Sequence, residues 1–159
     1  MSKTKVAIVK TGPLKGNPEF LGGKFVRYDE DVALLKEKIA ETIALSVGSI
    51  DNIIKEGETV LIKPNLAFLA PPESFSVVDP RMIEAMVSWL KENSKAGEIW
   101  VGDNPSLGQH VGRARPAFDA SGMKAAANRG GADKIIFFDE EEVVDVEIQG
   151  ARLFRKAKV

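Results

Sequence analysis

The feature that most constrains this chain is a regular alternation between short apolar runs rich in β-branched residues and longer segments whose apolar residues recur every three or four positions. The short runs are typical of buried strands and the longer segments of amphipathic helices. Strands that alternate with helices in this way form a mainly parallel sheet through right-handed crossovers. The predicted strands are Val6–Val9, Thr59–Ile62, Ile99–Val101 and Lys134–Phe138, and the predicted helices run from Asp31 to Val47, from Pro80 to about Ser94 and from Pro116 to Asn128.

We therefore expect an α/β fold of three layers, in which a mainly parallel sheet carries helices on both faces. After the fourth strand, Val144–Ile148 alternates apolar and charged residues, and Gln149-Gly150 is a turn signal. This pattern predicts a C-terminal β-hairpin at an edge of the sheet, returning through Leu153 and Phe154. With 159 residues and no linker or internal repeat, the chain is expected to be a single α/β domain over residues 1–159.

The composition excludes several classes of function. Lysine and arginine number 22 against 23 aspartate and glutamate residues, so neither nucleic acid nor an anionic membrane is an expected partner. The absence of cysteine excludes disulfides, thiolate metal sites and iron–sulfur clusters ligated by this chain. No stretch is long and apolar enough to span a membrane, so the expected location is the cytoplasm.

Polar residues follow the ends of two predicted strands. Lys63 and Asn65 come directly after the second strand, and Asp103 and Asn104 follow the third. Parallel α/β sheets bind ligands beyond the carboxyl ends of their strands, so we expect Lys63 and Asp103 to face each other there. With the two asparagines they are candidates to bind an anionic or hydroxylated small molecule. The alternatives are a lysine that extends into solvent and polar residues that serve only their own turns.

Three further residues are candidates for the same ligand. Asp79 precedes Pro80 at the start of the second helix, where it either helps to form an anion site or simply caps the helix. His110 and Arg113 lie in one loop, close to Arg115, and suit proton transfer and anion binding, or else form a solvated surface cluster. One histidine without cysteine does not make a zinc site of the usual composition, so no metal site is predicted and no cofactor is assigned.

Four strings stand in a characteristic order along the chain. They are Val60-Leu61-Ile62-Lys63-Pro64-Asn65-Leu66, then Asp79-Pro80 before a helix, then Ile99-Trp100-Val101-Gly102-Asp103-Asn104-Pro105, and then Ser121-Gly122 ahead of a Gly-Ala step and a strand. Together they resemble the amino-terminal half of the family called domain of unknown function 362. Two positions depart from the family pattern, which usually has a threonine where Val77-Val78 stands and a serine where Asn104 stands. The first departure removes support for a hydroxyl group in that loop.

The resemblance implies an α/β fold and a site at the strand ends, but not a reaction, because the family's activity is poorly defined. Family members are usually longer, and several carry a cysteine-rich ferredoxin-like module. The resemblance therefore implies the first half of a longer architecture, without the ferredoxin module.

Three hypotheses of function follow. The first is the small-molecule-binding half of an enzyme of this family, with Lys63, Asn65 and Asp103 holding the ligand. The second is a non-catalytic interaction subunit or fragment that pairs with another chain, or with a second copy, through its sheet edge near Ile148 and Leu153. The third is a nucleotide-dependent transferase, which rests on fold class alone. It lacks support from motifs, because the chain has no G-x-G-x-x-G after the first strand, no P-loop and no G-x-S-x-G. Whether the chain is an enzyme stays open at this point.

Overall fold

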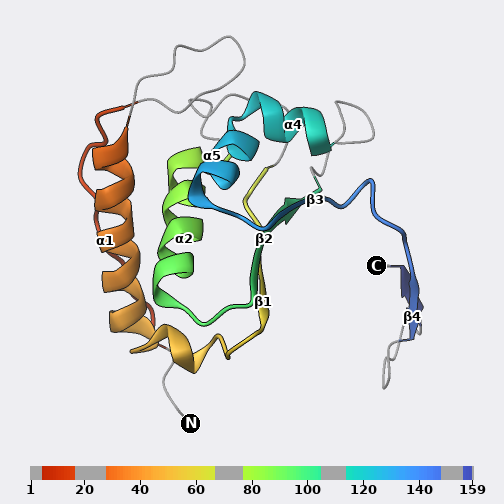
Figure 1. The fold of residues 1–159 in the computed structure, drawn as a ribbon, viewed down its shortest axis with the longest axis horizontal. Coiled ribbons are helices and arrows are strands. Elements are labelled where there is room, and N and C mark those ends of the chain that lie inside the picture. Colours follow the sequence, from red (N-terminus) through yellow and green to blue (C-terminus); the bar gives the residue numbers. More distant parts are fainter. Residues whose placement is uncertain (1–4, 17–27, 67–76, 105–113, 148–155, 159) are drawn as a thin grey trace.

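Three parallel strands form the central sheet of the computed structural model, which describes residues 5–16, 28–66, 77–104, 114–147 and 156–158 (Figure 1). The strands are β1 (Thr59–Ile62), β2 (Glu98–Asp103) and β3 (Lys134–Phe137), in the spatial order β1-β2-β3. Val60 is paired with Ile99, and Val101 with Ile135. The second, third and fourth strands predicted from the sequence are thereby confirmed, together with their parallel arrangement.

Helices lie beside this sheet, so the mixed α/β fold with helices around a parallel sheet is confirmed. They are α1 (Asp29–Ser46), the short 3-10 helix η1 (Ile50–Asn52), α2 (Pro80–Asn93), α4 (Ala114–Ala120) and α5 (Met123–Gly130). The helix α2 packs between α1 and α5 (Figure 1). The predicted third helix is in fact two helices, α4 and α5, because Gly122 takes a left-handed φ of 74° that interrupts the helical backbone.

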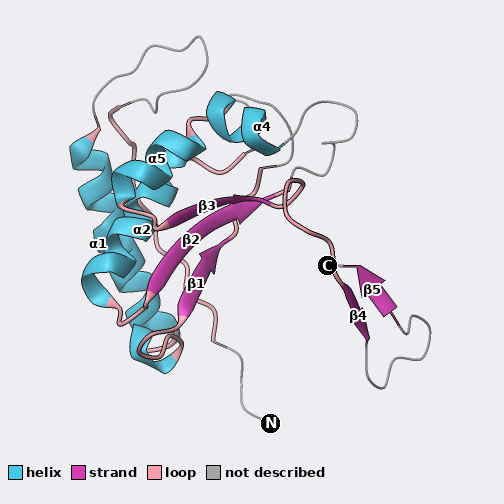
Figure 2. Cartoon of the chain, turned by 45° about the vertical axis from the view of Figure 1, so that its right-hand side comes forward, coloured by secondary structure: helices cyan, strands magenta, loops and turns pink. Residues whose placement is uncertain are grey.

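The hydrophobic core lies between the helices and one face of the sheet. Ile99 and Val101 of β2 are fully buried on this face, and Phe118 of α4 packs edge-on against Phe137 with ring centroids 5.3 Å apart. On the opposite face Leu61 is 46% exposed, and Trp100 is half-buried. The described helices lie on the side of the sheet that carries Ile99 and Val101 (Figure 2). The described residues therefore do not form the second helical layer that the sequence predicted for the opposite face.

The prediction of a strand at Val6–Val9 is wrong. Residues 5–11 form no strand in the structure, and the described part of β1 pairs only with β2. The side chains of Val6 and Ile8 are 80% and 87% exposed, whereas Val9 and Thr11 contribute to the wall of a pocket between α1 and α2. A β-branched run favours an extended backbone, but strand formation also needs a hydrogen-bonded neighbour, which local sequence does not reveal.

The structure confirms that the C-terminal region contains an antiparallel pair of strands. Strand β4 (Asp145–Glu147) pairs antiparallel with β5 (Lys156–Lys158), and Asp145 lies opposite Lys158. The two strands form a sheet of their own, separate from the three-stranded sheet, and stand away from the helices (Figure 2). The return strand therefore comes later in the chain than predicted, and residues 148–155 with the expected turn lie outside the described residues.

Within the part of the chain that the structure describes, no helix has both the length and the apolar character needed to cross a membrane.

The helices α5 and α2 approach each other closely at Gly130. A methyl group at this position would lie 2.8 Å from the carbonyl oxygen of Glu84 and 2.9 Å from Cβ of Val87. Both distances are shorter than van der Waals contact, and one of the atoms is backbone, which cannot move without displacing α2. Glycine is therefore required here for helix packing.

We expect Gly130→Ala to lower the free energy of unfolding by about 1–3 kcal/mol, because the added methyl group overpacks the contact between α5 and α2. Asn128→Ala, at an exposed position of the same helix, is the matched control and should change the stability by less than about 0.5 kcal/mol. Urea denaturation measures both. Equal stability of the Gly130 variant and the wild type would contradict the close approach.

Candidate functional site

The strands β1 and β2 end side by side, and this brings together two residues that are far apart in the chain. Ile62 is paired with Val101, so the residues that follow these positions leave the sheet at the same edge. We call this side, where the three strands end, the carboxyl edge. There the ammonium nitrogen of Lys63 lies 2.7 Å from Oδ1 of Asp103. The two head groups thus face each other, as the sequence predicted, and we refer to them as the Lys63–Asp103 pair.

The two partners differ strongly in exposure. The Lys63 side chain is 63% exposed, whereas that of Asp103 is only 3% exposed. The buried carboxylate has a fixed position, since Oδ2 accepts a hydrogen bond of 3.1 Å from the backbone N–H of Leu66. Its backbone carbonyl accepts a long hydrogen bond of 3.4 Å from the N–H of Phe138. The lysine can therefore move into solvent, while the aspartate cannot.

The other carboxylate oxygen of Asp103 is incompletely satisfied. Oδ1 is buried and accepts no hydrogen bond within the described residues, so that its contact with the Lys63 ammonium is an ion pair only. Nearly all buried polar atoms in proteins have a hydrogen-bond partner, and an exception calls for an explanation. Asp103 thus has one oxygen committed to the fold and one that is not.

The contact with Leu66 shows why Asp103 also matters to the fold. Leu66 is 1% exposed and forms an isolated antiparallel bridge with Val77, and the N–H of Val78 donates to the carbonyl of Asn65 at 2.9 Å. These contacts join the segment after β1 to the segment before α2. By accepting from Leu66, Asp103 ties both segments to the end of β2.

The structure distributes the other predicted site residues unequally. Asn65 and Asn104 are exposed on the segments that follow β1 and β2, so they share the carboxyl edge with the Lys63–Asp103 pair. His110 and Arg113 lie outside the described residues. Whether any of these residues binds a ligand stays a prediction.

Asp79 is occupied by its own helix. Its Oδ1 accepts from the N–H of Arg81 at 2.9 Å, which makes it the cap of α2, and its Oδ2 lies 2.6 Å from the Arg81 guanidinium. Of the two roles considered for Asp79, an anion site or a helix cap, the structure shows the helix cap. Arg115, the neighbour of the candidate Arg113, pairs with Glu140 and lies over the ring of Phe137, 4.3 Å from its centroid.

Sequence reasoning missed a second charged cluster, centred on Asp31. This residue is 2% exposed, and its two carboxylate oxygens accept from the backbone N–H groups of Lys15 and Gly16, each at 2.7 Å. Arg81 lies 3.1 Å from Oδ2 and also donates to the carbonyl of Gly16. The cluster thereby joins the N-terminal segment to the first turns of α1 and α2. Asp31 was recognisable only as a helix-start residue, and nothing in the sequence paired it with Arg81.

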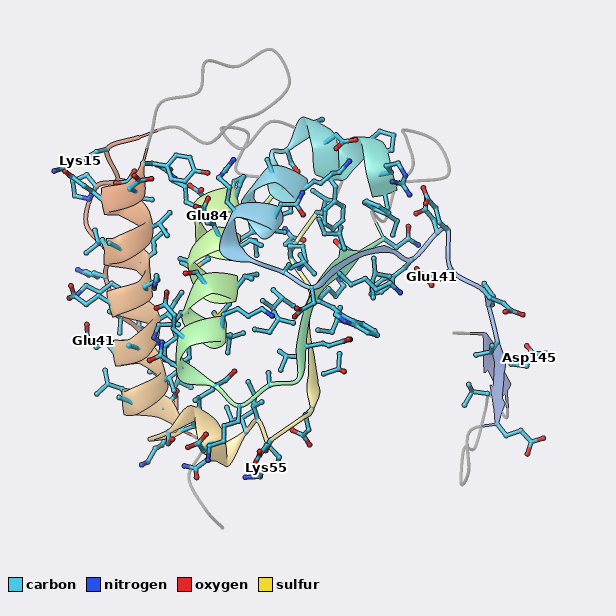
Figure 3. All side chains as sticks on the ribbon, in the orientation of Figure 1. Lys15, Glu41, Lys55, Glu84, Glu141 and Asp145 are labelled. Atoms are coloured by element: carbon cyan, nitrogen blue, oxygen red, sulfur yellow. The ribbon has the colours of Figure 1, made fainter. Side chains whose placement is uncertain are left out.

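A pocket of about 280 Å³ lies beside this cluster. Its walls include Lys15, which stands where α1 begins (Figure 3), together with Tyr28, Asp29, Glu30 and Asp31. Burial alone would raise the pKa of the Asp31 carboxyl group, but the two backbone N–H donors and the charge of Arg81 outweigh burial and lower it. Asp31 therefore stays ionised at neutral pH and acts as a hydrogen-bond acceptor, not as an acid.

Tyr28 at the same pocket is held as a neutral phenol. Burial, followed by the negative charge of Glu84, raises the pKa of Tyr28 well above its ordinary value of 10.0. Its hydroxyl donates to Glu84 at 2.9 Å and accepts from Arg129. Glu84 lies on α2 on the side of α5 (Figure 3), so this network fastens the two helices to the start of α1. Among the described residues, no group of three or more His, Cys, Asp or Glu side chains is arranged to hold a metal ion.

We expect the stability of the protein to decrease in acid partly through Asp31. Its folded-state pKa lies below the ordinary value of 3.8, so its contribution is present above that pH and is lost as the pH falls through the lower, folded value. Asp31→Asn should cost about 1–3 kcal/mol at pH 7 and should flatten the decrease in unfolding free energy between about pH 5 and pH 2. Urea titrations at several pH values measure this, with the exposed Asp51→Asn as control. An unchanged acid slope in Asp31→Asn would contradict the assignment.

Comparison with known proteins adds one match. A family model described as domain of unknown function (DUF362) matches residues 60–159, which include β1 from Val60 onward, the strands β2 and β3, the helices α2, α4 and α5 and the Lys63–Asp103 pair. No curated protein and no solved structure matches. Because the match covers more than half of the chain, including the strings that suggested it, this protein belongs to the DUF362 family.

Proposed function

We propose that the carboxyl edge binds a small anionic or hydroxylated molecule at the Lys63–Asp103 pair, and that the chain is the ligand-binding part of an enzyme. The observation that carries this proposal is the buried Oδ1 of Asp103, which accepts no hydrogen bond in the described part of the structure although it lies at the end of a strand beside an exposed lysine. Crevices at strand ends are the usual ligand sites of parallel α/β sheets.

The chemistry of the pair suits such a ligand. The Lys63 ammonium carries a positive charge on a flexible side chain, and it supplies up to three donors to a carboxylate or phosphate. Asp103 Oδ1 accepts from a hydroxyl or another donor. Asn65 and Asn104 are exposed at the same edge, and polar side chains of this kind carry one acceptor and two donors each. The arrangement binds and orients polar groups, and the reaction that follows is not assigned. We place this activity in the cytoplasm.

A second candidate function is association with another chain through the C-terminal hairpin. Exposed apolar side chains in and before β4 are those of Val143, Val144 and Val146. Figure 3 shows Asp145 of β4 well away from the helices. An isolated two-stranded hairpin is only marginally stable in water, so a further strand from a partner would stabilise it. Sedimentation distinguishes the two candidates, since a stable monomer at micromolar concentration argues against the hairpin as an interface.

We expect Lys63→Met to weaken the binding of L-lactate and inorganic phosphate about tenfold or more, because a charged hydrogen bond to the anion is lost. Lys63→Arg, which keeps the charge, should bind within a few-fold of the wild type. The measurement is an NMR titration that follows the amide of Leu66, since this N–H donates to Asp103 and senses any change at the pair.

Lys55→Met is the matched control, because Lys55 is an exposed lysine that precedes β1, whereas Lys63 follows the other end of this strand. It should leave the titration unchanged. Lys63→Met also removes the counter-ion that the described residues supply to a buried carboxylate, so the variants are compared at a temperature at which circular dichroism shows each of them folded. A folded Lys63→Met variant that binds both anions as tightly as the wild type would remove the basis for the proposed site.

A further inference from the structure

We infer that the ligand of the Lys63–Asp103 pair is a small zwitterion that carries an ammonium and a carboxylate group on the same carbon atom, that is, an α-amino acid. This inference rests on the proposed ligand site and specifies its substrate class. In the complex the ligand carboxylate contacts the Lys63 ammonium, and the ligand ammonium donates to Oδ1 of Asp103.

The first step concerns charge. The Asp103 side chain is 3% exposed, and Lys63 is its only ion-pair partner in the described structure. A ligand carboxylate that attracts the Lys63 ammonium weakens the ion pair between Lys63 and Asp103. The negative charge of Asp103 would then be buried without an adequate partner, which is energetically costly. A cationic donor on the ligand restores the balance, whereas a neutral hydroxyl supplies a hydrogen bond without charge. An ammonium group is therefore the better match for Oδ1.

The second step concerns distance. Lys63 Nζ and Asp103 Oδ1 are in contact, 2.7 Å apart, before a ligand binds. A lysine ammonium that is displaced by the ligand but stays beside the site remains near the carboxylate, which favours a ligand whose two charged groups are close neighbours. An ammonium and a carboxylate on one carbon atom satisfy this condition. Ligands whose two charges lie at opposite ends of a long chain do not.

The third step concerns which partner moves. Asp103 is the last residue of the central strand β2, and Leu66 fixes one of its oxygens. The Lys63 side chain is mainly in solvent and has four rotatable carbon–carbon bonds to rearrange. The carboxylate is thus the fixed point that recognises the ligand ammonium, and the lysine adapts to the carboxylate. A ligand amine takes up the position that the lysine ammonium occupies in the structure.

The test compares matched pairs of ligands with the full chain. L-alanine, L-aspartate and L-phenylalanine are titrated beside L-lactate, L-malate and L-phenyllactate, in which a hydroxyl replaces the ammonium. Chemical shift changes at the Leu66 amide give the affinities. We expect the best amino acid to bind about tenfold or more tightly than its hydroxy acid, because a hydrogen bond between two charged groups is stronger than one from a neutral donor.

The outcomes separate this inference from the proposal beneath it. Hydroxy acids that bind as tightly as their amino acids, with binding lost in Lys63→Met, overturn the amino acid assignment and leave the anion site intact. If none of the six compounds binds but inorganic phosphate does, the amino acid assignment alone is overturned, and if phosphate also fails to bind, both are overturned. Asp103→Asn supplies a second readout, since it keeps the shape but removes the charge. In a folded Asp103→Asn variant the preference for amino acid over hydroxy acid should vanish, whereas a merely structural Asp103 would leave that ratio unchanged.

Discussion

The structure of the carboxyl edge depends on the contacts of the buried Asp103 carboxylate. A charged group with 3% exposure is tolerated inside a protein only when donors and a counter-ion offset its loss of hydration. Leu66 supplies a donor from the segment that follows β1, and Lys63 supplies the charge from the residue after the same strand. The end of the central strand, the exit of its neighbour and, through Val77, the approach to α2 are therefore positioned by one side chain.

The buried carboxylates of Asp31 and Asp103 differ in how many of their oxygen atoms accept hydrogen bonds from the protein. Asp31 accepts from two backbone N–H groups and contacts Arg81, so both of its oxygens are used within the fold. In the described part of the chain, Asp103 has a hydrogen-bond donor on one oxygen only. The first arrangement holds the N-terminal segment against two helices and has a donor on each oxygen, while in the second one oxygen accepts no hydrogen bond from the described residues. Burial and charge are common to both, and the difference lies in how many of the acceptor sites the protein itself fills.

Much of this could be predicted from local sequence, and the failures share one physical cause. The strands at Thr59–Ile62 and Lys134–Phe137 follow from apolar runs, and the start of α2 follows from Asp79-Pro80. The meeting of Lys63 and Asp103 also followed, because both come at the ends of parallel strands. Val6–Val9 has the composition of a strand but pairs with no strand among the described residues, and the pairing of Asp31 with Arg81 spans fifty positions of the chain. Local patterns specify what a segment can become, whereas partners are chosen by tertiary packing.

The spatial order of the sheet also bears on how the chain folds. Because β1, β2 and β3 are adjacent in the same order in which they occur along the chain, each pairing closes one crossover, and no strand has to be inserted between two others. Such nearest-neighbour closures keep contact order low for a parallel sheet, which favours rapid folding. The shorter of these closures joins β2 to β3, where Val101 pairs with Ile135, whereas Val60 of β1 pairs with the more distant Ile99. The unit made of β2, α4, α5 and β3 also contains the buried residues Val101, Phe118 and Phe137, and we expect it to be the nucleus onto which β1 and the other helices assemble.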